Sequence, residues 1–185
     1  EKDICAEIRA WSKEALEKPS TFFRGLPPCP YAKQAWFDNR VAFLFKNEDS
    51  YQCLWSAISQ FEDTFDLVIL VDRKSKQSAD EFHGFLDGVN DAVAAGILVD
   101  KDIWVMGFHP DDEANEFVAD VDFSPLVEEP YAIIFVQRLS KLQVAADKLA
   151  KIGYYGTYDG LYDASSIFKK RSEFYRRLKN GDETH

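Results

Sequence analysis

The continuous aliphatic run at 67–71 is the feature that most constrains the fold of this 185-residue chain. Every residue from Leu67 to Val71 is apolar. A run without polar alternation is typical of a strand that is covered on both faces. A sheet with two covered faces needs helices on both sides, as in α/β proteins. The run therefore predicts a buried strand in a sheet that lies between helices.

Three further apolar runs predict neighbouring strands, at 41–45, 103–106 and 132–136. Apolar residues that recur near the helical period predict helices at 3–17, 50–62, 78–96, 140–153 and 164–179. Two of these predicted helices begin with a capping-box pattern, Ser78 with Glu81 and Ser140 with Gln143. We therefore expect an α/β (or α+β) fold, with a single mixed sheet of about four strands and helices packed on it.

The length and composition indicate a single domain over residues 1–185. An apolar fraction of 46% and an aromatic fraction of 15% suffice for a packed core. Within the domain we expect an N-terminal helix at 3–17, an α/β core at 41–152 and a basic C-terminal helix at 164–179.

The charge and the cysteines argue against several classes of protein. A net charge of −10 disfavours a nucleic-acid partner, because such binding needs cations that displace counterions from phosphates. Three cysteines without a Cys-x-x-Cys pair disfavour a disulfide framework and a standard zinc site. No apolar run approaches the ~18 residues of a membrane span, and no signal-peptide pattern is present. We expect an acidic cytoplasmic protein with reduced thiols and no membrane partner.

A proline-rich loop around Cys29 is the first candidate site. Pro28 precedes Cys29 and Pro30 follows it, so the backbone is held extended at little entropic cost. Lys33 is placed to stabilise a thiolate, as is the amino end of a helix that starts near Tyr31. The alternative is a buried structural cysteine without reactivity.

His109, at the end of the strand predicted to reach 108, is the second candidate. In open α/β sheets, sites form beyond the carboxyl ends of strands. Asp72 would share this edge if the two strands run in the same direction, and Asp112 follows His109 closely. The alternative is a turn-forming histidine among solvated acids. A metal set of His83, His109 and one carboxylate has no supporting ligand spacing, so no metal ligand is assigned.

Two charged segments offer a further interpretation. Residues 109–129 are acidic and lack Lys and Arg, and loops of this length are often functional. The predicted helix at 164–179 is basic instead. Together they suit a non-catalytic module that binds a protein partner, although a basic run is commonly a solvated helix face.

Two motifs of the chain resemble an uncharacterised family of small bacterial domains of unknown function. Residues 25–33, Gly-Leu-Pro-Pro-Cys-Pro-Tyr-Ala-Lys, are similar to its Cys-Pro-Phe/Tyr-Ala motif. Residues 108–110, Phe-His-Pro, are similar to its later motif, which continues to Asp112 and Asn115. Arg138 matches an arginine that follows. The resemblance covers roughly residues 4–150 and implies that these positions belong to one shared site.

These observations favour a small-molecule enzyme with a cysteine/histidine site. Cys29 would be the nucleophile or redox thiol, His109 the base, and Asp112 or Asp72 the group that orients it. The remaining binding positions would be Lys33, Tyr31, Asn115, Asp72 and Arg138. The alternatives are a metal-dependent enzyme, with iron or zinc on His109 and carboxylates, and the protein-binding module. The sequence assigns no cofactor and no oligomeric state.

Overall fold

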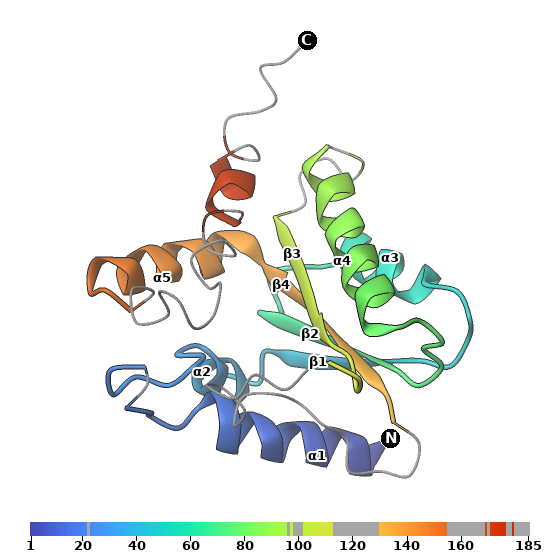
Figure 1. Ribbon diagram of the computed structural model, residues 1–185, viewed down its shortest axis with the longest axis horizontal. Coiled ribbons are helices and arrows are strands. Elements are labelled where there is room, and N and C mark those ends of the chain that lie inside the picture. The colour runs from blue at the N-terminus through green and yellow to red at the C-terminus, as the bar shows by residue number, and fades with distance from the viewer. Residues whose placement is uncertain are drawn as a thin grey trace.

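The computed structural model describes residues 1–21, 23–95, 97, 102–112, 130–154, 169, 171–176 and 179. In this part of the chain, helices pack on a single mixed sheet of four strands (Figure 1). The predicted α/β class is therefore confirmed. No helix among these residues has the length and apolar character needed to cross a membrane.

The sheet has the strand order β1-β2-β4-β3. Its strands are β1 (Val41–Lys46), β2 (Leu67–Asp72), β3 (Ile103–Phe108) and β4 (Ala132–Arg138). Strands β1 and β2 are parallel, whereas β4 is antiparallel to both β2 and β3. It follows that β1, β2 and β3 run in one direction, and their carboxyl ends reach the same edge of the sheet.

One face of the sheet packs against α3 (Gln52–Ser59) and α4 (Ala79–Ala94), and we call it the α4 face. Helix α4 begins with the capping box that the sequence predicts. The Ser78 hydroxyl accepts a hydrogen bond from the Glu81 amide, and the Glu81 carboxylate accepts one from the Ser78 amide at 2.9 Å. The core of this face includes Leu54, Ile58, Phe82, Leu86, Val89 and Val93 of the two helices.

The edge strand β3 is fixed tightly to α4. The buried Asn90 side chain donates to the Val105 carbonyl and accepts from its amide, both at 2.8 Å. Gly107 lets the strand approach the helix, since a Cβ atom there would lie 2.8 Å from the Phe82 ring and 2.9 Å from a Leu86 methyl group of α4. The α4 face therefore leaves no room for added atoms at Gly107.

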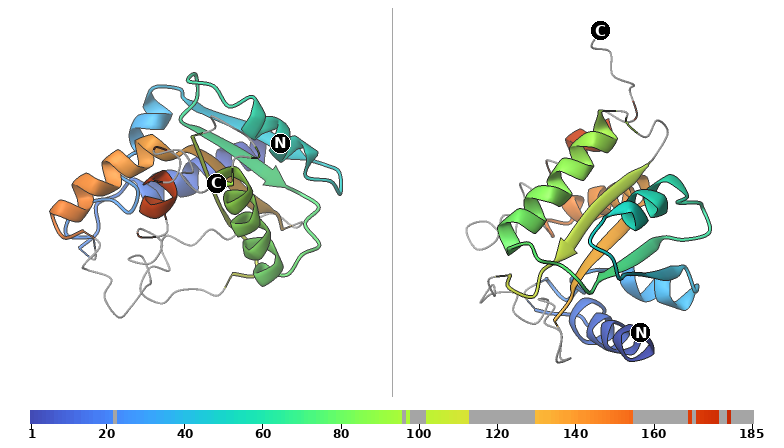
Figure 2. Two further views of the ribbon diagram at one scale, coloured as in Figure 1. Left: turned by 90° about the horizontal axis from the view of Figure 1, so that it is seen from above. Right: turned by 90° about the vertical axis from the view of Figure 1, so that its right-hand side faces the viewer.

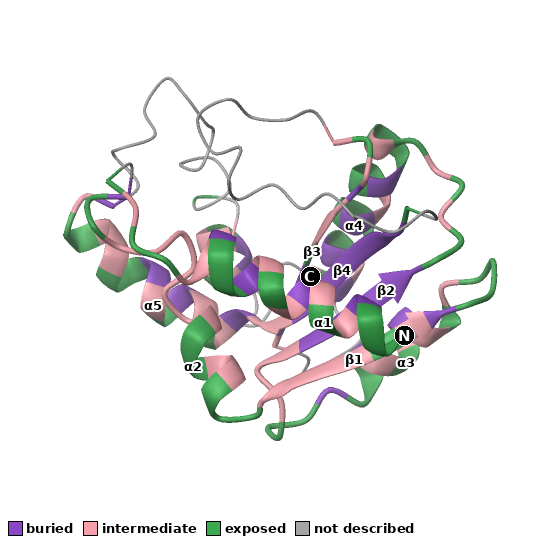
Figure 3. Cartoon of the chain, turned by 90° about the horizontal axis from the view of Figure 1, so that it is seen from below, coloured by how far each residue is buried: buried purple, intermediate pink, exposed green. Residues whose placement is uncertain are grey.

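The opposite face packs against α1 (Lys2–Trp11), and we call it the α1 face (Figures 1 and 2). The predicted helix 3–17 is observed as α1 followed by a π-helical turn, η1 (Ser12–Leu16). A short helix, α2 (Ala32–Phe37), then covers part of the same face. Figure 3 shows the buried residues concentrated in β2, β4 and the inward sides of the helices.

Helix α5 (Leu139–Lys151) follows β4 directly and extends beyond that end of the sheet. Its predicted capping box is wrong, because Ser140 does not exchange hydrogen bonds with Gln143. Instead the Asp102 carboxylate accepts bonds from the Ser140 amide (2.7 Å) and hydroxyl. Gln143 donates to Asp147 within the helix and to Ser172. A residue distant in sequence therefore caps this helix.

The two charged segments lie largely outside the described residues. This holds for 113–129, and for half of the residues of the predicted helix at 164–179. Residues 171–176 are helical, and Phe174 is buried with its ring 5.8 Å from that of Trp104. Phe174 therefore lies on the inward side of this segment.

Candidate functional site

The Cys29 loop is fixed by hydrogen bonds at both sides. The Cys29 amide donates to the Leu16 carbonyl at 3.0 Å, which ties the loop to η1. The Tyr154 hydroxyl lies 2.9 Å from the Pro28 carbonyl and 3.2 Å from the Pro27 carbonyl. These contacts join the loop to the residues that follow α5. The loop is thus held by both the N-terminal helices and the end of the core.

A cavity of about 210 Å³ lies between this loop, the N-terminal helices and the α1 face. Its lining includes Cys29 and Tyr31 from the loop and the aromatic side chains of Trp11, Trp36 and Phe135. An apolar cavity of about 150 Å³ is large enough to hold benzene. This pocket therefore has room for a molecule of one or two rings.

Most polar side chains of the pocket bond to other protein groups. The Ser12 hydroxyl accepts from the Trp36 indole N–H at 2.8 Å and donates to Glu17 at 3.0 Å. The Gln34 amide donates to Asp38 at 2.8 Å. Because these groups are already hydrogen-bonded, the pocket presents mainly apolar surface to a ligand.

Charged residues stand where the pocket meets the amino end of β2. Asp66 forms ion pairs with Lys141 and with the Arg40 guanidinium, whose Nε lies 2.9 Å from the carboxylate. Partial burial would raise the pKa of Asp66, but the hydrogen bonds from Arg40 and Lys141 lower it below its ordinary value. Asp66 therefore carries its negative charge at neutral pH and neutralises part of the positive charge of Arg40 and Lys141.

The thiol of Cys29 is not poised as a thiolate. Burial raises the pKa of Cys29 above its ordinary value, and hydrogen bonds from the Tyr31 and Ala32 amides offset this only in part. The positive charge that acts on the thiol belongs to Arg171, whereas Lys33 is exposed. At neutral pH Cys29 is a protonated thiol, contrary to the thiolate that Lys33 was expected to stabilise.

His109 lies at the end of β3 on the α4 face. Its ring is buried, with its centroid 5.4 Å from that of Phe82. The Nδ1 atom accepts from the Asp111 amide at 3.2 Å. Asp112 accepts from the His109 amide at 2.7 Å and is hydrogen-bonded to the His83 ring at 2.7 Å. Asp112 therefore holds the backbone of this turn against α4 and does not orient the His109 ring.

The structure does not bring Cys29 and His109 together. Cys29 lines a pocket with Leu67 and Gln137, at the amino end of β2 on the α1 face. His109 lies at the other end of the sheet, against α4. The predicted pairing of a cysteine nucleophile with a histidine base is therefore absent from this geometry. Asn115, the fourth residue of the expected shared site, lies outside the described residues.

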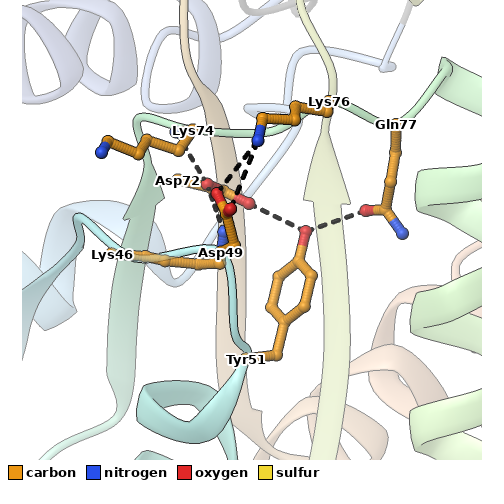
Figure 4. Close-up of polar contacts among 7 residues, drawn as sticks. All are labelled: Lys46, Asp49, Tyr51, Asp72, Lys74, Lys76 and Gln77. Carbon is orange, nitrogen blue, oxygen red and sulfur yellow. Dashed lines mark hydrogen bonds and ion pairs between the residues drawn. The ribbon is translucent and has the colours of Figure 1, made fainter.

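Asp72 lies at the same edge as His109, with β4 between them, as expected for strands that run in one direction. It is completely buried and so is its partner Lys46, at 0% and 2% exposure. Lys46 Nζ and the Lys74 amide donate to one Asp72 oxygen at 2.9 and 3.0 Å, and the Tyr51 hydroxyl donates to the other at 2.8 Å (Figure 4).

These residues form a closed polar network at the carboxyl ends of β1 and β2. The Tyr51 hydroxyl also lies 2.8 Å from the side-chain amide oxygen of Gln77. Burial, together with the neighbouring Asp72 carboxylate, raises the pKa of Tyr51 well above its ordinary value. A buried ion pair needs such hydrogen bonds to offset its desolvation. The network therefore joins β1, β2 and the start of α4, and its carboxylate is fully engaged.

Arg138, the last predicted binding residue, lies on the α4 face at the opposite edge from His109. Its guanidinium lies 3.1 Å from the Asp63 carboxylate and 5.2 Å from the centre of the Phe61 ring. It therefore contributes to neither the His109 turn nor the Cys29 pocket. Its neighbour Gln137 does line the pocket. The sequence pattern alone did not single out Gln137. The signal available was a polar residue directly after the apolar run 132–136.

Among the described residues, no group of three or more His, Cys, Asp or Glu side chains is placed to hold a metal ion. His83 and His109 are connected through Asp112, but that arrangement does not form such a group. The metal-dependent alternative thus has no support from these residues.

No family model matches the chain, and comparisons with curated proteins and with solved structures give no match either. The resemblance to the family with the Cys-Pro-Phe/Tyr-Ala motif therefore stays a prediction.

Proposed function

We propose that this protein binds a small, largely apolar molecule in the pocket beneath the Cys29 loop. The observation that carries the proposal is a cavity of about 210 Å³ with aromatic walls and a fixed loop. Concave, mostly apolar sites with a few polar groups are the usual form of small-molecule sites. Burial of a one- or two-ring molecule there would supply the affinity at about 25 cal/mol per Å² of apolar area.

Binding fits the chemistry of Cys29 better than nucleophilic catalysis does. Its burial favours the neutral thiol, and the one histidine proposed as its base is on the other face of the sheet. In this proposal Cys29 forms part of the pocket wall. The small-molecule partner that the sequence favours is retained as the ligand. We also propose that the protein is cytoplasmic and that the thiol of Cys29 is reduced there.

Quinoline, a neutral two-ring probe, tests the pocket by ligand-observed NMR and calorimetric titration. Ala32→Leu enlarges a side chain that lines the pocket, so it should weaken quinoline binding about tenfold or more. Lys33→Leu makes the same residue at the next position of α2, where the side chain is exposed, and should leave binding unchanged. Absence of quinoline binding to the native protein, or equal binding to both variants, would refute the proposal.

A further inference from the structure

We infer that the pocket selects a neutral heteroaromatic molecule that carries a hydrogen-bond donor and an acceptor side by side, as a lactam does. We also infer that the side-chain amide of Gln137 forms hydrogen bonds with this donor and this acceptor. The inference rests on the proposed function, because it names the class of ligand for the same pocket. It is carried by Gln137, a lining residue whose side-chain amide is not engaged by other side chains among the described residues.

Gln137 differs from the other polar side chains of the pocket. It lies at the carboxyl end of β4, paired in register with Leu67, and it lines the cavity. Its side-chain amide makes no hydrogen bond to the part of the chain that the structure describes, whereas the Gln34 amide is bonded to Asp38. A primary amide presents a carbonyl acceptor and an N–H donor in one plane. The Gln137 amide is therefore complementary to the edge of a ligand that carries one hydrogen-bond donor and one acceptor.

The charges around the pocket favour a neutral ligand. Asp66 is bonded to both Arg40 and Lys141, so each of these ions already has a partner in the protein, and a charged ligand would have to compete with these pairs. The thiol of Cys29 is protonated at neutral pH, because its pKa is raised by burial. Burying an unpaired charge among apolar walls is costly, whereas a lactam edge paired with an amide is not.

The aromatic lining favours a planar molecule. Trp11, Trp36 and Phe135 belong to three different elements, α1, α2 and β4, and all line the cavity. Aromatic rings gain from stacked or edge-to-face contacts beyond the burial of area. The indole N–H of Trp36 is bonded to Ser12, so it is already satisfied without a ligand. Planar shape and one polar edge are therefore the two features that this pocket recognises.

The test compares quinoline with carbostyril, the lactam of the same ring system, by calorimetric titration of the native protein. Carbostyril should bind about tenfold more tightly, because it adds a donor and an acceptor that Gln137 can pair. N-methylcarbostyril, which lacks the donor, should lose most of this advantage. Quinaldate, an anionic quinoline, should bind more weakly than quinoline.

Two matched variants assign the preference to one residue. Gln137→Leu should bind quinoline and carbostyril equally, since the amide is gone. Gln34→Leu changes another lining glutamine, whose amide is already bonded to Asp38, and should keep the tenfold preference.

The outcomes separate the inference from the function on which it rests. Binding of neither quinoline nor carbostyril would refute the pocket itself. Binding of both with equal affinity, a preference that survives Gln137→Leu, or tighter binding of quinaldate would leave the pocket and overturn the inferred ligand class.

Discussion

The two faces of the sheet use polar residues in opposite ways. On the α4 face, Lys46 and Asp72 are buried and form an ion pair, and the half-buried Tyr51 donates its hydroxyl to Asp72 (Figure 4). On the α1 face, a cavity remains beneath the Cys29 loop, and Gln137 lines it with a side-chain amide that has no partner among the described residues. The difference teaches that a cluster of polar residues marks a binding site only where the cluster leaves groups uncommitted.

The position of the closed network makes this comparison instructive. It occupies the carboxyl ends of parallel strands, which is where sites commonly form in α/β sheets. Here the Asp72 carboxylate at that edge is engaged by Lys46, Tyr51 and the Lys74 amide, and the cavity lies near the other end of β2. Rules about topology therefore predict where a site is favoured, and the packing of particular side chains decides whether it is open.

The largest expected effect is on the closed network. Asp72→Ala leaves the Lys46 ammonium buried without its partner, so the free energy of unfolding should fall by about 3–5 kcal/mol. Urea denaturation measures this loss. Asp49→Ala is the matched control, because it breaks an exposed pair with Lys76 and should cost less than about 1 kcal/mol.

The double variant Lys46→Met/Asp72→Leu sharpens the same test. It removes both charges and should recover much of the stability that Asp72→Ala loses, because no unpaired ion stays buried. A double variant as unstable as the single one would show that the network acts through its shape and not through its charge.

A smaller effect is expected from crowding the α4 face. Gly107→Ala places a Cβ atom 2.6 Å from the Ile133 carbonyl oxygen and should lower the free energy of unfolding by about 2 kcal/mol. Gly84→Ala is the control, since an added Cβ meets nothing within 4 Å at this exposed position of α4. It should stabilise the helix by about 0.5–1 kcal/mol. Equal effects in thermal unfolding would contradict the tight contact at β3.

The smallest expected effect concerns the reactivity of Cys29. Its pKa lies above the ordinary value of 9.0, so the thiolate is scarce at neutral pH and increases as the pH rises through and beyond that value. Iodoacetamide should therefore label Cys29 no faster than Cys5 or Cys53 at neutral pH, and its rate should still be rising above pH 9.0. Mass spectrometry of the labelled peptides gives the three rates.

Fast labelling of Cys29 that reaches its plateau near neutral pH would contradict the assignment of Cys29 as an unreactive part of the pocket on the α1 face. It would mean that the pocket holds a stabilised thiolate, and it would return Cys29 to the role of a nucleophile.

Local patterns predicted the elements well and the site poorly. The Ser78–Glu81 pattern correctly predicted the start of α4, because both partners belong to the same helical turn. The equivalent pattern at Ser140 and Gln143 failed, because Asp102 supplies the bonds instead. The proline loop was singled out from sequence, but Gln137 was not, since nothing local indicates that its amide lacks a partner.

The sequence by itself determined that 67–71 is a buried strand, that helices cover both sides of its sheet, and that Cys29 is held in a constrained loop. These follow from burial periodicity and from the fixed φ of proline, which act over a few residues. Only the tertiary structure decided that β4 lies between β2 and β3 and that Cys29 and His109 lie on opposite faces. The physical reason is that a side chain's face and its hydrogen-bond partners depend on how distant segments pack, and no local pattern records that packing.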